Sequence, residues 1–116
     1  MMAKEFGLER RTTEFAKVVI RECIILPRNP INDRPVGQTV GASGSIGVNY
    51  REANDALGKK DFILRLKIAR REAQESFHWL ELLLEANTTK EKAIKPLLRE
   101  AEELKNILSS IILKSE

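Results

Sequence analysis

The stretch KKDFILRLKIARREAQESFHWLELLLEA, residues 59–86, decides the fold because one apolar stripe runs along its whole length. The stripe repeats at intervals of three and four residues and consists of Phe62, Leu66, Ala69, Ala73, Phe77, Leu80 and Leu84. This period places the apolar side chains on one face of an α-helix. The sequence therefore predicts a long amphipathic helix over 59–86, which follows Gly58 and stops at Asn87.

Three further segments repeat at the helical period and predict helices over about 8–26, 34–57 and 89–114. The connections between the four helices are short, which favours antiparallel neighbours. A chain of 116 residues is long enough for one hydrophobic core. We therefore expect a single all-α domain over 1–116, an antiparallel up-down-up-down four-helix bundle.

Several residues predict where these helices begin and end. The first helix should end before Pro27, because the residue before a proline is pushed out of the α region. Asp33 is the expected N-cap of the second helix. Thr88 and Glu91 have the spacing of a capping box, and Pro96 should restart the last helix after a short leading turn over 89–94.

Residues 35–50, PVGQTVGASGSIGVNY, contain no charged side chain, although 32% of the chain is charged. The small residues of this stretch that share helical spacing are Gly37, Gly41, Gly44, Ser45 and Gly47. An interior glycine weakens a helix by roughly 0.5–1 kcal/mol, so we expect this face to pack closely against a neighbouring helix. A glycine-rich turn over 36–47 is the alternative. A phosphate-binding loop is not indicated, because the segment has no lysine and no preceding strand.

The residues typical of catalysis or metal binding do not form a recognisable set. His78 is the only histidine and follows Glu75 at the spacing found in di-iron bundles, but such a site needs a second pair of this kind. Cys23 is alone, and no nearby histidine or second cysteine would activate its thiol. We therefore expect no catalytic residue, no metal and no cofactor, and a protein that is not an enzyme.

The same features predict a cytoplasmic protein without membrane contact. Residues 1–8 carry charges and no apolar core, so they do not resemble a signal peptide. No apolar run reaches the ~20 residues that a membrane span needs. The lone Cys23 fits a reducing compartment.

The net charge of +3 is unevenly distributed along the chain. Residues 51–71 hold seven basic and three acidic side chains, whereas residues 72–103 hold four basic and eight acidic ones. The basic side chains are Arg51, Lys59, Lys60, Arg65, Lys67, Arg70 and Arg71. Phosphates are the natural ligand of such a cluster, so these residues are candidate contacts to RNA or DNA. A solvated face paired with nearby carboxylates is the alternative.

The segment SIGVNYREA, residues 45–53, followed by Lys59-x-Asp61-Phe62-Ile63, resembles the four-helix-bundle family related to the 23S rRNA intervening-sequence proteins, also called the S23 family. The resemblance covers about residues 11–113. Its most specific part is the run Asn49, Tyr50, Arg51, Glu52 and Ala53. Two residues depart from the family pattern: Val48 replaces a small residue, and Gly58 replaces a serine that commonly caps the third helix.

The resemblance implies an antiparallel bundle that forms, in several members, a ring of five subunits. Some members are encoded inside insertions in ribosomal RNA genes, which suggests association with RNA. Self-association is also expected because residues 62–68 and 79–84 hold more apolar side chains than one core stripe needs. Two functions remain open: an oligomeric module that binds nucleic acid through its basic residues, and a protein–protein scaffold that binds none.

Overall fold

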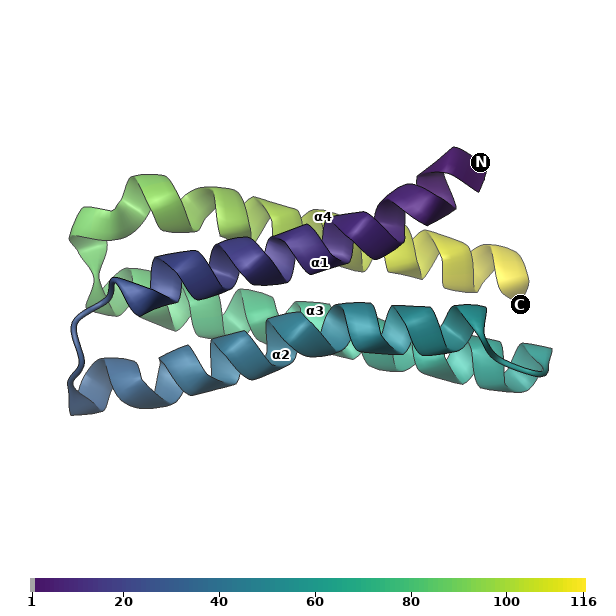
Figure 1. Cartoon of the computed structure of the whole chain (residues 1–116), viewed down its shortest axis with the longest axis horizontal. Coiled ribbons are helices and arrows are strands. Elements are labelled where there is room, and N and C mark those ends of the chain that lie inside the picture. The colour runs from purple at the N-terminus through teal and green to yellow at the C-terminus, as the bar shows by residue number, and fades with distance from the viewer. Residues whose placement is uncertain (1) are drawn as a thin grey trace.

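The computed structural model describes residues 2–116 and the side chains from residue 7 onward. The described residues form four α-helices and one 3₁₀ turn, without a strand (Figure 1). The helices are α1 (Met2–Ile24), α2 (Pro30–Asn54), α3 (Lys59–Ala86) and α4 (Glu91–Ser115), and the 3₁₀ turn η1 is Thr88–Lys90. The predicted all-α class and the number of helices are thus confirmed.

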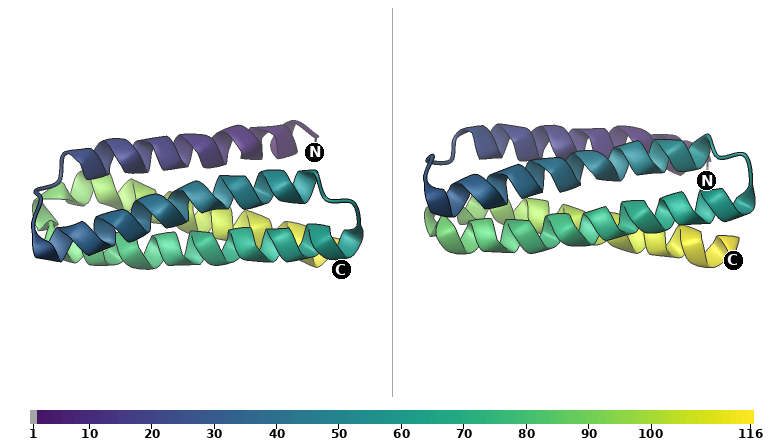
Figure 2. Two further views of the ribbon diagram at one scale, coloured as in Figure 1. Left: turned by 60° about the horizontal axis from the view of Figure 1, so that its bottom comes forward. Right: turned by 90° about the horizontal axis from the view of Figure 1, so that it is seen from below.

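Successive helices run in opposite directions, which gives an up-down-up-down bundle of 44 × 23 × 19 Å (Figures 1 and 2). Helix α3 packs against α2 and α4 along most of its length, and among the described residues its backbone does not approach that of α1 closely. Helix α1 packs on α2 and contacts α4 only lightly. The first helix is therefore the least embedded part of the fold.

The core consists of the apolar stripes predicted from the sequence. In α3 the stripe contributes Leu66, Ala69, Ala73 and Leu80 to the fully buried interior, while Phe62, Phe77 and Leu84 pack at its margin. The largest fully buried apolar side chains of the other helices are Val19, Ile46, Leu104 and Leu108. Helical period was sufficient to find Val19, Leu104 and Leu108, because burial follows the face of each helix, whereas Ile46 of α2 was not predicted.

The start of α2 differs from the prediction, because Asn29 and not Asp33 is the N-cap. The Asn29 side chain accepts a hydrogen bond from the Asn32 amide at 2.8 Å, and Pro30 fills the first helical position, where no N–H donor is needed. Asp33 lies in the first turn and accepts a hydrogen bond from the Asn29 amide at 3.2 Å. Helix α2 therefore begins four residues earlier than expected and ends at Asn54.

The predicted start of the last helix is also wrong. Thr88–Lys90 forms a 3₁₀ turn, and no side chain caps α4, so the expected capping box between Thr88 and Glu91 is absent. Helix α4 runs through Pro96 without a restart. Pro96 is exposed and lies one and a half turns into the helix, where its missing N–H leaves only the Lys92 carbonyl without its helical donor.

The glycines of α2 are helical, which excludes the alternative of a glycine-rich turn, but most of them do not pack. Gly37, Gly41 and Gly44 are exposed, and a Cβ atom built on any of them meets no atom within 4 Å. Only Gly47 is in close contact, since its Cβ would lie 2.9 Å from Oγ1 of Thr12 in α1. The prediction of a packed face is therefore wrong for the first three glycines, because the buried face of α2 lies on the other side of the helix. Ser45 is half-buried at the edge of that exposed face.

Candidate nucleic-acid interface

Two lysines open α3 next to the α2–α3 turn, residues 55–58. Lys59 and Lys60 are exposed and occupy the first two positions of the helix. The N-cap Gly58 offers no side-chain acceptor, and the first main-chain bond of α3 runs from the Phe62 amide to the Gly58 carbonyl at 3.0 Å. The earlier amides and the positive end of the helix dipole therefore lie in the same first turn as the two lysines and the acidic Asp61. This corner of the bundle is suited to an anion.

Three of the seven predicted basic residues form ion pairs within the chain: Arg51, Arg65 and Lys67. Arg51 of α2 binds Glu9 of α1, with 3.0 Å between Nη1 and Oε1. Arg65 binds Glu52 of α2 at 2.9 Å and lies 3.7 Å from Asp61 in its own helix. These contacts stabilise helix packing and neutralise the two cations. Arg51 and Arg65 therefore fit the alternative of a solvated face paired with carboxylates better than a nucleic-acid contact.

Lys67 and Arg70 are turned toward α4. The Lys67 ammonium lies 3.6 Å from the Glu116 side chain, and the half-buried Arg70 donates a hydrogen bond to the Ser109 hydroxyl at 3.4 Å. In the described part of the chain, Lys59, Lys60 and Arg71 have no ion pair. Arg71 lies three turns from the two lysines, about 17 Å along the helix. The seven residues therefore do not form one continuous basic surface, and only Lys59 and Lys60 form a pair.

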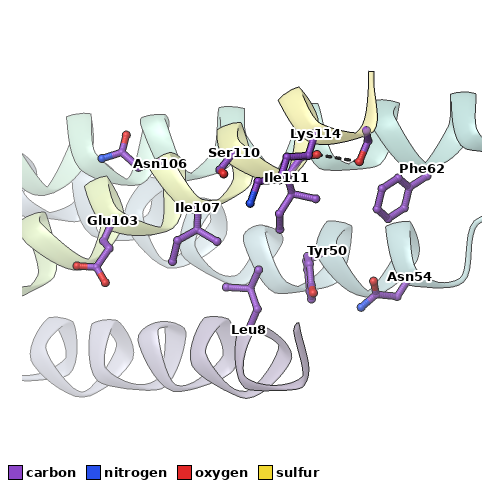
Figure 3. Close-up of a pocket in the computed structure, with 11 residues that line it drawn as sticks. Leu8, Tyr50, Asn54, Phe62, Glu103, Asn106, Ile107, Ser110, Ile111 and Lys114 are labelled. Carbon is purple, nitrogen blue, oxygen red and sulfur yellow. Dashed lines mark hydrogen bonds between the residues drawn. The ribbon is translucent and has the colours of Figure 1, made fainter. Parts of the chain in front are cut away.

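Two concave surfaces lie at this end of the bundle, and Lys59 lines one of them. A shallow groove of about 440 Å³ runs past Ala53, Gly58, Lys59 and Ser115. Next to it, a more enclosed pocket of about 490 Å³ lies between the first turns of α1 and the end of α4 (Figure 3). Its lining residues are Leu8, Tyr50, Asn54, Phe62, Glu103, Asn106, Ile107, Ser110, Ile111, Lys114 and Ser115. The pocket is mainly apolar, with the polar side chains from α2 and α4 around the apolar ones in the close-up.

The five-residue run that carries the family resemblance serves helix packing. Tyr50 and Ala53 are buried in the core. Asn49 donates a hydrogen bond to the Ser45 carbonyl at 2.9 Å, Arg51 reaches α1, and Glu52 reaches α3. Four of the five residues therefore hold α2 against its neighbours, whereas the Asn49 hydrogen bond lies within α2 itself.

The remaining candidates for chemistry lie apart from one another. His78 makes an edge-to-face contact with Trp79, with 5.2 Å between the ring centroids. Among the residues that the structure describes, no three His, Cys, Asp or Glu side chains are close enough to share a metal ion. Burial raises the pKa of the Cys23 thiol to about 11, so the thiol stays protonated at neutral pH. None of the described helices is long and apolar enough to cross a membrane.

Two polar contacts across the bundle were not predicted from the sequence. Arg11 of α1 binds Glu100 of α4 through two hydrogen bonds of 2.6 and 2.9 Å and also binds Glu103. Asn32 and Asn87 exchange hydrogen bonds of 2.9 and 3.2 Å between their side-chain amides. The partners are 89 and 55 residues apart, so no local pattern could have revealed them.

Residues 5–110 match the family model of the 23S rRNA-intervening sequence proteins. The chain belongs to this family. A solved family structure from Bacteroides thetaiotaomicron, described as a protein of unknown function from the S23 ribosomal protein family, is 30% identical in sequence, with a TM-score of 0.79. The alignment covers 90% of this chain and 97% of the Bacteroides chain, so the bundle of the intervening-sequence proteins is present over nearly its full length. No curated protein sequence matches the chain significantly.

Proposed function

We propose that this protein is a non-enzymatic, self-associating four-helix bundle of the cytoplasm that binds the phosphates of RNA at the start of α3. The observation that carries the proposal is the pair Lys59 and Lys60, which has no carboxylate partner in the described chain and adjoins the uncapped amides of α3. Ammonium groups beside free helix amides provide both charge and hydrogen-bond donors for a phosphate oxygen. The family name, which refers to 23S rRNA, favours RNA over DNA as the ligand.

One such corner would contact only a few phosphates, so a single copy would bind weakly. Self-association brings several copies of this binding site to one RNA strand. It thereby increases their effective concentration and raises the overall affinity without a new kind of contact. A ring of five subunits is the assembly that the family resemblance implies. Because phosphate contacts release counterions, the affinity should fall steeply as the salt concentration rises.

The test is a titration of fluorescently labelled RNA at several salt concentrations, read by anisotropy. Lys59→Gln combined with Lys60→Gln should weaken binding at low salt and reduce the salt slope by about two, roughly one for each lysine. Lys90→Gln combined with Lys92→Gln removes the same charge at the opposite end of the bundle and is the matched control. Equal affinities of the two double variants would show that binding depends on net charge alone and would overturn the proposed site.

A protein–protein scaffold without nucleic-acid binding is the second candidate, because several large apolar side chains lie in solvent. The exposed ones at the two ends of the bundle are Ile24, Ile25, Ile31, Leu57 and Leu113. Such side chains favour contact with another protein surface. If the wild-type protein shifts no polynucleotide at low salt but forms a stable assembly, the scaffold function replaces the proposal.

A further inference from the structure

Helix α3 has an outer face that no other helix of the chain covers. It lies against α2 and α4, on the side of the bundle away from α1 (Figure 2). The side of this face nearer to α2 carries a row of residues at helical spacing, the outer stripe of α3: Leu64, Ile68, Arg71, Glu75, Trp79 and Leu82. Leu64 is 54% exposed and Leu82 is 43% exposed, whereas Ile68 and Trp79 are half-buried. The stripe therefore offers apolar side chains at both ends and two opposite charges, Arg71 and Glu75, in its middle.

The order of residues in the outer stripe is self-complementary. Read toward its centre near Ala73, each half gives two apolar residues and then one charge, and the two charges have opposite signs. Leu64 and Leu82 are 18 residues apart, which is five complete helical turns, so they lie on the same line along α3. An antiparallel copy of the helix centred on Ala73 would place Leu64 opposite Leu82 of the second copy, and Arg71 opposite its Glu75.

The remaining charges of α3 favour the same orientation. The first half of the helix, residues 59–72, carries six basic and two acidic side chains, and the second half, residues 73–86, carries three acidic side chains and no lysine or arginine. Antiparallel pairing sets each basic half against an acidic half, whereas parallel pairing sets like charges against each other. In the described chain neither Arg71 nor Glu75 has an ion-pair partner, so both are available to a second copy. A nucleic acid fits this stripe poorly, because Glu75 and Glu72 beside Arg71 repel phosphates.

We propose that two copies of this chain pair antiparallel through the outer stripe of α3, about a two-fold axis near Ala73. The inference rests on the self-association proposed above but names a contact different from that of a ring, since a two-fold contact uses the same patch on both copies and a ring joins two different patches. The pairing leaves Lys59 at the end of the contact and the α2–α3 turn open to solvent. Phosphate binding at that corner and pairing through the stripe are therefore compatible.

Disulfide cross-linking tests the geometry directly. Leu64→Cys and Leu82→Cys variants, distinguished by tags of different size, are mixed and oxidised. The two should form a mixed disulfide dimer, whereas neither variant alone should cross-link well, because each new cysteine would face a leucine. Leu113→Cys, at another exposed leucine outside α3, mixed with Leu82→Cys is the matched control and should stay uncross-linked. Cross-linking of the control to the same extent would overturn the proposed register.

Charge exchange tests the ionic centre. Arg71→Glu alone and Glu75→Arg alone should each weaken self-association roughly tenfold, because every substitution sets like charges opposite each other twice. The double variant R71E/E75R restores opposite charges and should recover the wild-type mass, as measured by sedimentation with the helical content checked by circular dichroism. Unchanged mass in both single variants would overturn the pairing, and loss of RNA binding by Arg71→Glu without a change of mass would assign the stripe to nucleic acid.

The outcomes also separate this inference from the proposed function. An assembly heavier than 13.2 kDa that forms no Leu64–Leu82 cross-link would refute the two-fold contact and leave self-association through other surfaces intact. A 13.2 kDa monomer at every accessible concentration would refute both self-association and the pairing, while leaving the RNA titration of Lys59 and Lys60 as an independent result.

Discussion

At the scale of single residues, Gly41 and Gly47 of α2 show that the role of a glycine depends on which side of the helix it occupies. The two glycines are both helical, and both fit the small-residue spacing of the sequence. Gly41 lies on the solvent side, whereas Gly47 lies against Thr12 of α1. The spacing alone could not predict which side of α2 is buried, because the segment lacks the charged residues that would mark its exposed face.

Alanine substitutions at these two positions should therefore change stability in opposite directions. Gly41→Ala should stabilise the protein by about 0.5–1 kcal/mol, since the methyl group meets open space and the helix loses a flexible residue. Gly47→Ala should destabilise it by about 1–3 kcal/mol, since the methyl group would press on the fully buried Thr12. Urea unfolding of the two variants measures both changes. Equal changes of the same sign would mean that α2 is rotated relative to the structure.

At the scale of elements, Arg11 is the main polar contact between α1 and α4, two helices that otherwise touch lightly. The hydrogen bonds that Arg11 donates to Glu100 and Glu103 raise the pKa of its guanidinium above the usual range. The same contact lowers the pKa of the Glu103 carboxyl, through its hydrogen bond with Arg11. A carboxyl whose pKa is lowered by folding stabilises the protein above its unfolded pKa, and this contribution disappears as the pH falls through its folded pKa.

We expect Arg11→Gln to lower the free energy of unfolding by about 1 kcal/mol at neutral pH, mainly through the loss of the two hydrogen bonds to Glu100. The difference between wild type and variant should shrink below the unfolded pKa of a glutamate, about 4.3, as the Glu103 carboxylate becomes protonated. Urea unfolding at pH 7 and pH 3.5 measures this difference. Lys95→Gln, which removes an exposed pair within α4 at Glu91, is the control and should change stability little. A difference that persists unchanged in acid would show that Arg11 acts through packing.

The helices could be predicted from the sequence because their apolar period is local information. The ends of α2 and α4 were predicted less well, since Asn29 and Asp33 are equally good caps by residue type and only the fold selects between them. The candidate site contains fewer basic residues than predicted for a different reason. Arg51 is paired with Glu9, 42 residues away, and Lys67 with Glu116, so the loss of these cations from the basic cluster depends on tertiary contacts.

At the scale of the whole molecule, the two ends of the bundle are closed differently. At the α1–α2 end, Asn32 is 2% exposed and binds both the Pro27 carbonyl, at 2.9 Å, and Asn87 at the end of α3. At the other end, the pocket of Figure 3 separates the first turns of α1 from α4. The Asn32–Asn87 pair thus holds one end together, and an apolar hollow occupies the other.

The effects of removing the Asn32 and Asn87 side-chain amides on the free energy of unfolding should not be additive. Asn32→Ala or Asn87→Ala leaves the other amide without one of its partners, which costs about 1–3 kcal/mol. The double variant should cost less than the sum of the single variants, and a double-mutant cycle from urea unfolding measures the difference. Strict additivity would indicate that the two amides act independently. Thr39→Ala, which removes a buried hydroxyl bonded within its own helix, serves as a control without cross-helix coupling.

The Asn32–Asn87 pair also bears on how the protein forms during its synthesis. The two residues are 55 positions apart, so Asn32 emerges from the ribosome while its partner has not yet been made. At roughly 5–20 residues per second, the delay is about 3–11 seconds. Over that interval the Asn32 side chain has water as its partner in place of Asn87, and closing this end of the α1–α2 hairpin would bury an amide without its acceptor and donor. We therefore expect the first two helices to settle into their final packing at this end only after Asn87 has also left the ribosome.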